Sequence, residues 1–259
     1  MLRRSLFVQR FVALVALAGM MTACGASGGD DDEVSSVVSP VAEETSTVAP
    51  ITIMPIGDSH TQGATGWGTY RCYLDAMLKG AEVPFDFVGT QTEPYGGEPY
   101  GCPSDFDQDH EAFWGTHIQR LADIATPSVE TLQPDVALIL IGGVDLDRNQ
   151  PARVAEDLQT FIIGLQAVSP DITVFVSQLI PCNMPLPKCT DPYVAVNDLI
   201  ASFGTLSTDE SSVAVVDMAT GLGPDYYQDA VHMNSAGDEL VADRWMTALQ
   251  DSGVIGSSD

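Results

Sequence analysis

Five short runs of branched apolar residues recur along the chain from residue 51 onward, with helix-like segments between them. Runs of this kind, bounded by Gly and Pro, are typical of strands that are buried on both faces. Their alternation with helices predicts a parallel sheet with right-handed crossovers. The expected strands are 51–56, 85–88, 136–141, 172–179 and 213–216, and the expected helices are 70–78, 116–124, 151–168, 194–203 and 235–249. The sequence therefore predicts one α/β domain with a five-stranded parallel sheet over residues 51–259.

Two short segments at opposite ends of this domain carry chemically active side chains. The first expected strand is followed by Gly57-Asp58-Ser59, and Asp229-Ala-Val-His232 lies near the end of the chain. In an open parallel sheet, ligands bind at the carboxyl ends of the strands, which is where Ser59 falls. A serine nucleophile needs a base, and the base needs an acid group to orient it. We therefore expect Asp229 to orient His232, and His232 to take the proton of Ser59. The simpler alternative is that these side chains only cap the helices that follow them.

Six segments, in matching order and spacing, give the chain a resemblance to the SGNH hydrolases, also called GDSL-type esterases. They are Met54-Pro-Ile-Gly-Asp-Ser-His-Thr-Gln-Gly63, Thr69-Tyr-Arg71, Phe87-Val-Gly-Thr-Gln91, Asp109-His-Glu-Ala-Phe-Trp-Gly115, Leu140-Ile-Gly-Gly-Val-Asp145 and Asp229-Ala-Val-His-Met-Asn234. Within the family they look like the bacterial carbohydrate esterases that include acetylxylan esterases. The resemblance implies a three-layer α/β/α sandwich of the flavodoxin-like type, a Ser59–His232–Asp229 triad and no cofactor.

The resemblance also implies an oxyanion hole with three donors: a serine N–H, a glycine N–H and an asparagine side chain. Ser59 and Gly115 match the first two. The third block reads Gly142-Gly143-Val144-Asp145, so Val144 occupies the expected asparagine position. Losing one such donor typically costs about 10²–10³ in rate. Either another side chain substitutes, or turnover is weak, and a non-catalytic carbohydrate-binding protein is the extreme case. The candidate substitutes are Asn149, Asn183 and Gln178.

Other residues near the expected site carry weaker signals. Four aromatic residues flank it and either stack on sugar faces or pack in the core, with core packing at least as good an explanation for two of them. They are Trp67, Tyr70, Phe113 and Trp114. Asp145, Asp147 and Asn149 alternate like calcium ligands, but the rest of that loop pattern is absent. We therefore assign no metal site from the sequence.

The N-terminal segment has the features of a bacterial export signal. Three arginines precede the apolar stretch 11–21, and Thr22-Ala23-Cys24 follows it. This order of charged, apolar and small residues is typical of a signal peptide, here 1–23, and the apolar stretch is short for a membrane span. Cys24 resembles the acylated cysteine of a lipobox, although plain secretion is the alternative. Residues 24–50 are acidic and rich in Ser, Thr, Val and Pro without a period, which predicts a disordered tether.

Four further cysteines lie in the expected domain. An even number outside the cytoplasm suggests two disulfides. Cys182 and Cys189 bracket a Pro-rich loop, so pairing them is economical, and Cys72 with Cys102 follows by elimination. A zinc site is the weaker alternative, because no histidine lies beside them at ligand spacing. We expect an exported protein that faces an oxidising compartment and is attached by its lipid to the outer membrane or cell surface.

The net charge of the chain limits the classes of partner that it is expected to bind. The formal net charge of −26 argues against nucleic acid or an anionic membrane surface, so that any membrane contact is through the lipid alone. The negative charge is compatible with a neutral ester as substrate.

We expect an esterase that removes small acyl groups, in the first instance acetyl, from polysaccharide. That substrate class rests on the resemblance, mainly on segments 69–71 and 109–111. A lipase-like or lysophospholipase-like member of the same family is the alternative, and it would need a long apolar cleft. The sequence gives no prediction of the oligomeric state.

Overall fold

The computed structural model of the protein describes residues 49–184 and 187–256. The expected signal peptide, the candidate lipid site Cys24 and nearly all of the expected tether lie outside these residues. In the described chain no helix has the length and apolar character that crossing a bilayer requires.

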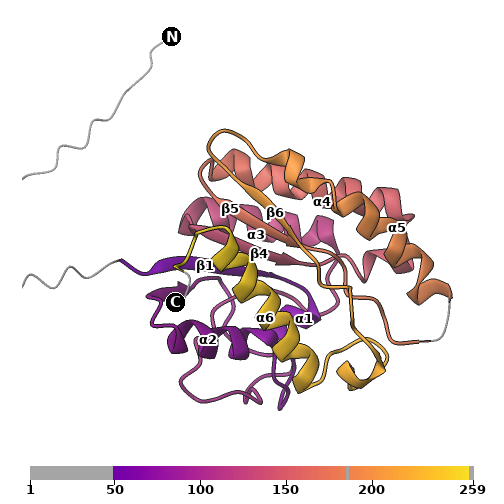
Figure 1. Cartoon of the computed structure of the whole chain (residues 1–259), viewed down its shortest axis with the longest axis horizontal. Helices are drawn as coiled ribbons and strands as arrows, with labels where there is room; N and C mark the ends of the chain where they lie inside the picture. Colours follow the sequence, from indigo (N-terminus) through magenta and orange to yellow (C-terminus); the bar gives the residue numbers. More distant parts are fainter. Residues whose placement is uncertain (1–48, 185–186, 257–259) are drawn as a thin grey trace, which may run out of the picture. The chain divides into compact units, whose positions relative to one another are not determined.

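The strands form one parallel sheet in the order β2-β1-β4-β5-β6 (Figure 1). Its members are β1 (Ile51–Gly57), β2 (Phe85–Phe87), β4 (Val136–Leu140), β5 (Thr173–Ser177) and β6 (Val213–Val216). All five expected strands are present. A sixth, β3 (Glu111–Ala112), pairs with the end of β1 and was not expected, because two residues carry no apolar run.

The continuous apolar runs reflect burial on both faces of the sheet. In β4 and the residue after it, Ala137, Ile139 and Ile141 belong to one buried cluster, whereas Val136, Leu138 and Leu140 belong to another. All six side chains are almost fully buried. Alternate residues of a strand point to opposite faces. Each face therefore has its own apolar core, and the fold is the expected three-layer sandwich.

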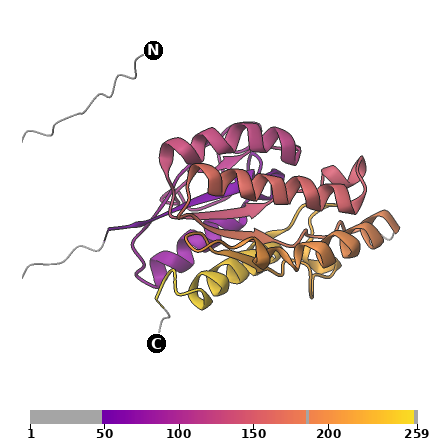
Figure 2. The same ribbon diagram turned by 90° about the horizontal axis from the view of Figure 1, so that it is seen from above.

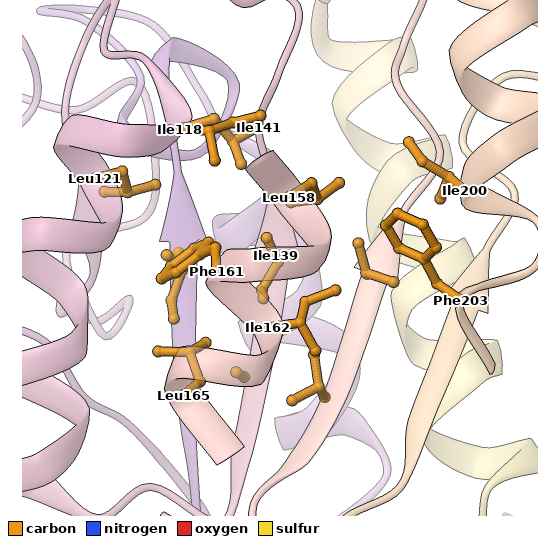
Figure 3. Packing of buried hydrophobic residues seen from close by; sticks show 14 of the residues in the cluster. Ile118, Leu121, Ile139, Ile141, Leu158, Phe161, Ile162, Leu165, Ile200 and Phe203 are labelled. Atoms are coloured by element: carbon orange, nitrogen blue, oxygen red, sulfur yellow. The ribbon is translucent and has the colours of Figure 1, made fainter. Parts of the chain in front are cut away.

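Helices cover both faces. They are α1 (Ser59–Gln62), α2 (Tyr70–Gly80), α3 (Ile118–Leu132), α4 (Pro151–Val168), α5 (Asp191–Ile200) and α6 (Ser235–Asp251). The core on the Ile139 face takes its helical side chains from α3, α4 and α5, and the opposite core from α2 and α6. Figure 2 shows α3 and α4 on one side of the sheet and the paired α2 and α6 on the other. In Figure 3, Leu158, Phe161 and Ile162 of α4 lie over Ile139.

Two helices depart from their expected bounds by more than two residues. The helix expected over 116–124 is α3, which continues through Pro127 to Leu132. Proline removes one backbone hydrogen bond, but Ala125 and Val129 on either side of it are fully buried, so packing keeps the segment helical. The helix expected over 194–203 begins earlier, at Asp191, with a proline in its first turn. Proline is favoured there because that N–H has no partner within the helix.

The cysteines of the domain form two disulfides. Cys72 pairs with Cys102 and Cys182 with Cys189, at Cα–Cα distances of 5.8 and 4.9 Å. These are the two expected pairs. The first packs against Tyr100 and Phe106, and the second closes the loop that precedes α5.

Candidate active site

Ser59 begins the short helix α1, directly after the first strand ends at Gly57. Asp58 caps this helix by accepting a hydrogen bond from the N–H of His60 at 3.1 Å. A Cβ on Gly57 would collide with the carbonyl oxygen of Leu140 on the neighbouring strand, so glycine is required where the chain turns. The tight turn holds Ser59, 8% exposed, at the carboxyl edge of the sheet.

The side chains of Ser59, His232 and Asp229 form one hydrogen-bonded chain. The Nε2 atom of His232 lies 3.1 Å from Ser59 Oγ, and its Nδ1 atom lies 2.8 Å from Asp229 Oδ2. The other carboxylate oxygen of Asp229 accepts the N–H groups of Val231 and His232, both at 2.7 Å. Burial acts to raise the pKa of Asp229, but these hydrogen bonds, first that from the His232 N–H, hold the pKa below its usual value. Asp229 is therefore an ionised acceptor that fixes the imidazole.

The helix-capping alternative does not fit the structure. The N-cap of α6 is Asn234, whose side chain accepts the N–H groups of Ala236 and Gly237. The N-cap of α1 is Asp58. Ser59 and His232 thus bond through their side chains to each other and not to a helix end.

Aromatic rings enclose the imidazole of His232. Trp114 stacks on it, with ring centroids 4.6 Å apart and planes at 28°, and Trp67 lies tilted against it at 5.4 Å. Tyr70 and Phe113, the other two aromatics flanking the site, pack in the two cores. Of the four aromatic residues considered from the sequence, two border the candidate site and two are structural.

Burial disfavours the charged form of two ionisable groups beside Ser59. Burial, with a contribution from His232, lowers the pKa of His60 to about 3, so its ring is neutral at physiological pH. Burial raises the pKa of Asp58 to about 7 against the hydrogen bond from His60, and nearby Asp145 adds to the increase. Both effects favour uncharged groups around Ser59, which suits a neutral substrate.

A cavity of about 270 Å³ opens beside Ser59 and His232. The three positions expected for the oxyanion hole, Ser59, Gly115 and Val144, all line it. Valine contributes no side-chain donor there. Further lining residues used below are His60, Trp114, Gly143, Leu146, Leu179, Met184, Lys188 and Tyr193.

The three candidate substitute donors do not line this cavity, which corrects the sequence-based expectation. Gln178 is directed to α5, where its Nε2 donates to the carbonyl of Asn197 at 3.3 Å. The backbone N–H groups of Asn149 and Asn183 bond to the carbonyls of Asp145 and Ala230. Sequence position near the expected site did not predict which residues line the cavity, because the lining depends on how the loops and α5 pack.

The segments that suggested a carbohydrate esterase are structural. Arg71 is completely buried, and it donates to the carbonyls of Thr61 and Gln108 and to the hydroxyl of Tyr100, each at 2.8 Å. Glu111 accepts the N–H and the hydroxyl of Thr90 at 2.9 and 3.0 Å. Neither residue lines the cavity. These side chains hold the loops around the site and give no direct evidence about the substrate.

Two residues that support the site were not singled out from the sequence. Gln62 Oε1 accepts the N–H of Trp114 at 2.6 Å and so fixes the segment that contains Gly115. Tyr95 stacks on Trp114 with ring centroids 4.9 Å apart. Among the described residues, no group of three His, Cys, Asp or Glu side chains is arranged to hold a metal ion. Asp145, considered above as a possible ligand, accepts the N–H of Ile118 instead.

A hydroxyl, an imidazole and a carboxylate in one hydrogen-bonded chain form the arrangement found in serine hydrolases. The profile of the GDSL-like Lipase/Acylhydrolase family matches residues 56–240, and the chain belongs to this family of SGNH enzymes. A search of curated protein sequences gives no match.

Solved structures similar to this chain include two family 3 carbohydrate esterases. The one from Talaromyces cellulolyticus has 23% identity and a TM-score of 0.69, covering 80% of this chain and 100% of the other. The one from Clostridium thermocellum has 27% identity and a TM-score of 0.65, with 80% and 100% covered. A serine-to-alanine mutant of an acetyl esterase, with an acetate ion, has 23% identity and a TM-score of 0.67, with 78% and 99% covered.

Proposed function

We propose that the protein is a serine esterase that removes small acyl groups, acetyl first among them, from a carbohydrate. The observation that carries the proposal is the hydrogen-bonded chain from Asp229 through His232 to Ser59, which ends at a cavity. In the proposed reaction His232 takes the proton of Ser59 as Oγ attacks the ester carbonyl, and then returns it to the leaving alcohol. Water releases the acyl group from Ser59 by the same sequence.

The backbone N–H groups of Ser59 and Gly115 are the proposed donors to the developing oxyanion. Both residues line the cavity. Gly115 adopts a positive φ of 64°, a conformation that favours glycine over residues with a Cβ. The ionised Asp229 stabilises the imidazolium form of His232 in the transition state.

Cavity size and similarity both support a small acyl group. A volume of about 270 Å³ lies just below the usual range of small-molecule pockets, roughly 300–1,000 Å³. The similar structures include two carbohydrate esterases and an acetyl esterase. A lipase-like enzyme is the second candidate, because the cavity wall includes the apolar side chains of Leu146, Leu179 and Met184.

The test is hydrolysis of p-nitrophenyl acetate, butyrate and octanoate, followed by acetate release from acetylated xylan. Ser59→Ala is expected to remove nearly all activity, whereas Ser202→Ala is the matched control. Ser202 is exposed, donates to the carbonyl of Leu199 and lies outside the cavity. Equal rates for wild type and Ser59→Ala would refute the esterase. Serine-dependent rates that rise with chain length would favour the lipase-like candidate.

We also propose that the enzyme works outside the cytoplasm, joined by the segment 24–50 to a lipid on Cys24. The two disulfides support an oxidising compartment. With the full chain expressed in a bacterium, the protein should fractionate with membranes, and Cys24→Ser should release it. Unchanged fractionation of Cys24→Ser would contradict the anchor.

A further inference from the structure

The cavity contains side chains able to complete the oxyanion hole where Val144 cannot. Besides Ser59 and His232, and leaving carboxyl groups aside, the described lining residues with a side-chain N–H or O–H are His60, Trp114, Lys188 and Tyr193. The rings of His60 and Trp114 pack against the imidazole of His232. The side chain of Lys188 is exposed. Tyr193 differs from the other three because it is buried beside the third block.

Tyr193 enters the cavity from α5, on which it is the third residue. It is 6% exposed, and its ring packs in the core that α5 shares with α3 and α4. Its hydroxyl oxygen lies 3.4 Å from the point where a Cβ on Gly143 would stand. Gly143 directly precedes Val144 in the chain, and both line the cavity. The phenol therefore reaches the segment from which an asparagine would have donated.

The hydroxyl of Tyr193 is available as a donor. It makes no hydrogen bond to any of the described residues, although a buried tyrosine hydroxyl usually has a partner. The hydroxyl oxygen is also not sealed from solvent, in contrast to the buried polar atoms that lack a partner. An unpaired hydroxyl at the wall of a cavity is free to bond to whatever occupies that cavity.

The surroundings of Tyr193 keep its proton in place. Burial raises the pKa of Tyr193 to about 12, and the nearby carboxyl groups of Asp58 and Asp147 add to the increase. The phenol thus remains protonated at every pH at which a histidine base operates. A neutral donor whose pKa is far above the working pH can stabilise an oxyanion without losing its proton.

We propose that the Tyr193 hydroxyl donates a hydrogen bond to the oxyanion of the tetrahedral intermediate, as a substitute for the amide that Val144 lacks. The assignment rests on the proposed serine esterase. Tyr193 forms and breaks no covalent bond, and its proton stays on the phenol oxygen. The negative charge develops on the former carbonyl oxygen as Ser59 Oγ attacks, and the N–H groups of Ser59 and Gly115 share it. Gly143 fits this role, because a larger side chain there would cover the hydroxyl.

The test compares Tyr193→Phe with wild type in p-nitrophenyl acetate hydrolysis by the full chain. The variant keeps the ring and removes only the oxygen. We expect kcat to fall about 10²–10³-fold with little change in KM, the range typical of one lost oxyanion donor. Thermal unfolding should be unaltered, because the hydroxyl has no partner among the described residues. Tyr73→Phe is the matched control, since Tyr73 is half-buried on α2 and lies outside the cavity.

Two outcomes would overturn the assignment while leaving the esterase intact. One is a kcat within about threefold of wild type, and the other is a loss carried by KM alone, which would make the hydroxyl a substrate-binding group. Ser59→Ala measured alongside separates these from failure of the proposed function. If Ser59→Ala is as active as wild type, the esterase itself fails.

Discussion

Trp114 stacks on His232, and Tyr95 stacks on the same indole. The centroid distances are 4.6 Å to His232 and 4.9 Å to Tyr95, with interplanar angles of 28° and 23°. The carboxylate that orients His232 is itself 44% exposed at its side chain. The indole therefore supplies packing that an exposed Asp229 cannot give, and it restricts the imidazole to the plane from which Nε2 meets Ser59.

Removing this ring should weaken catalysis. We expect Trp114→Ala to lower kcat/KM for p-nitrophenyl acetate about tenfold, because an aromatic pair contributes about 0.5–1.5 kcal/mol beyond its buried area. Trp114→Phe keeps a ring over the imidazole and should retain most of the activity. Tyr95→Ala is the control, because Tyr95 stacks on the indole but has no ring contact with His232 among the described residues, and the expected loss is below about threefold. Full activity of Trp114→Ala would mean that Asp229 orients His232 unaided.

Restoring the asparagine should have an effect that depends on Tyr193. In the wild-type background we expect Val144→Asn to change kcat less than about threefold, because the phenol already supplies the donor. In the Tyr193→Phe background the same substitution should raise kcat about tenfold or more, since neighbouring groups with one role are not additive. Steady-state kinetics of the four proteins measures this coupling. A large gain in the wild-type background would instead mean that the native site lacks its third donor.

Removal of each disulfide should lower stability, but only removal of Cys182–Cys189 should also affect KM. Met184 and Lys188, within the loop closed by Cys182–Cys189, line the cavity, whereas Cys72–Cys102 lies outside it. Replacing Cys182 and Cys189 by serine should raise KM several-fold and lower the free energy of unfolding by about 2–3 kcal/mol. The longer Cys72–Cys102 loop should cost about 3–4 kcal/mol on the loop-entropy relation, with KM unchanged. Calorimetry and kinetics of both double variants test this. Equal KM values for the two variants would mean that the loop closed by Cys182–Cys189 does not contribute to substrate binding.

Asp238 should make stability depend on pH. It is 8% exposed on α6, and burial raises its pKa to about 8 against a hydrogen bond from the Tyr70 backbone. Between about pH 4 and 8 the folded state keeps a proton that the unfolded state loses, so this group lowers stability as pH rises through that window. Asp238→Asn should therefore be more stable than wild type at pH 8, by on the order of a few kcal/mol, with a smaller difference at pH 4. A pH-independent difference in urea unfolding would contradict the shift.

Much of the fold follows from local patterns in the sequence. The apolar runs predicted the five main strands because a strand between two helical layers needs apolar residues on both faces. The Asp229–His232 pair was visible because its members are three residues apart in one turn. The Cys182–Cys189 pair was likewise suggested by its short loop. In each case the interaction that matters is close in sequence.

Contacts between distant segments were decided by the tertiary structure. Ser59 and His232 are 173 positions apart, and only the sheet order brings the end of β1 against the turn before α6. The stacking of Trp114 on His232 and the approach of Tyr193 to Gly143 depend in the same way on how loops and α5 pack. Pro127 stays inside a helix because the buried face around it outweighs one lost hydrogen bond. Local sequence determined which residues are suited to strands, turns and chemistry. Packing across the sheet decided which of them meet, because side-chain direction and long-range distance are properties of the assembled core.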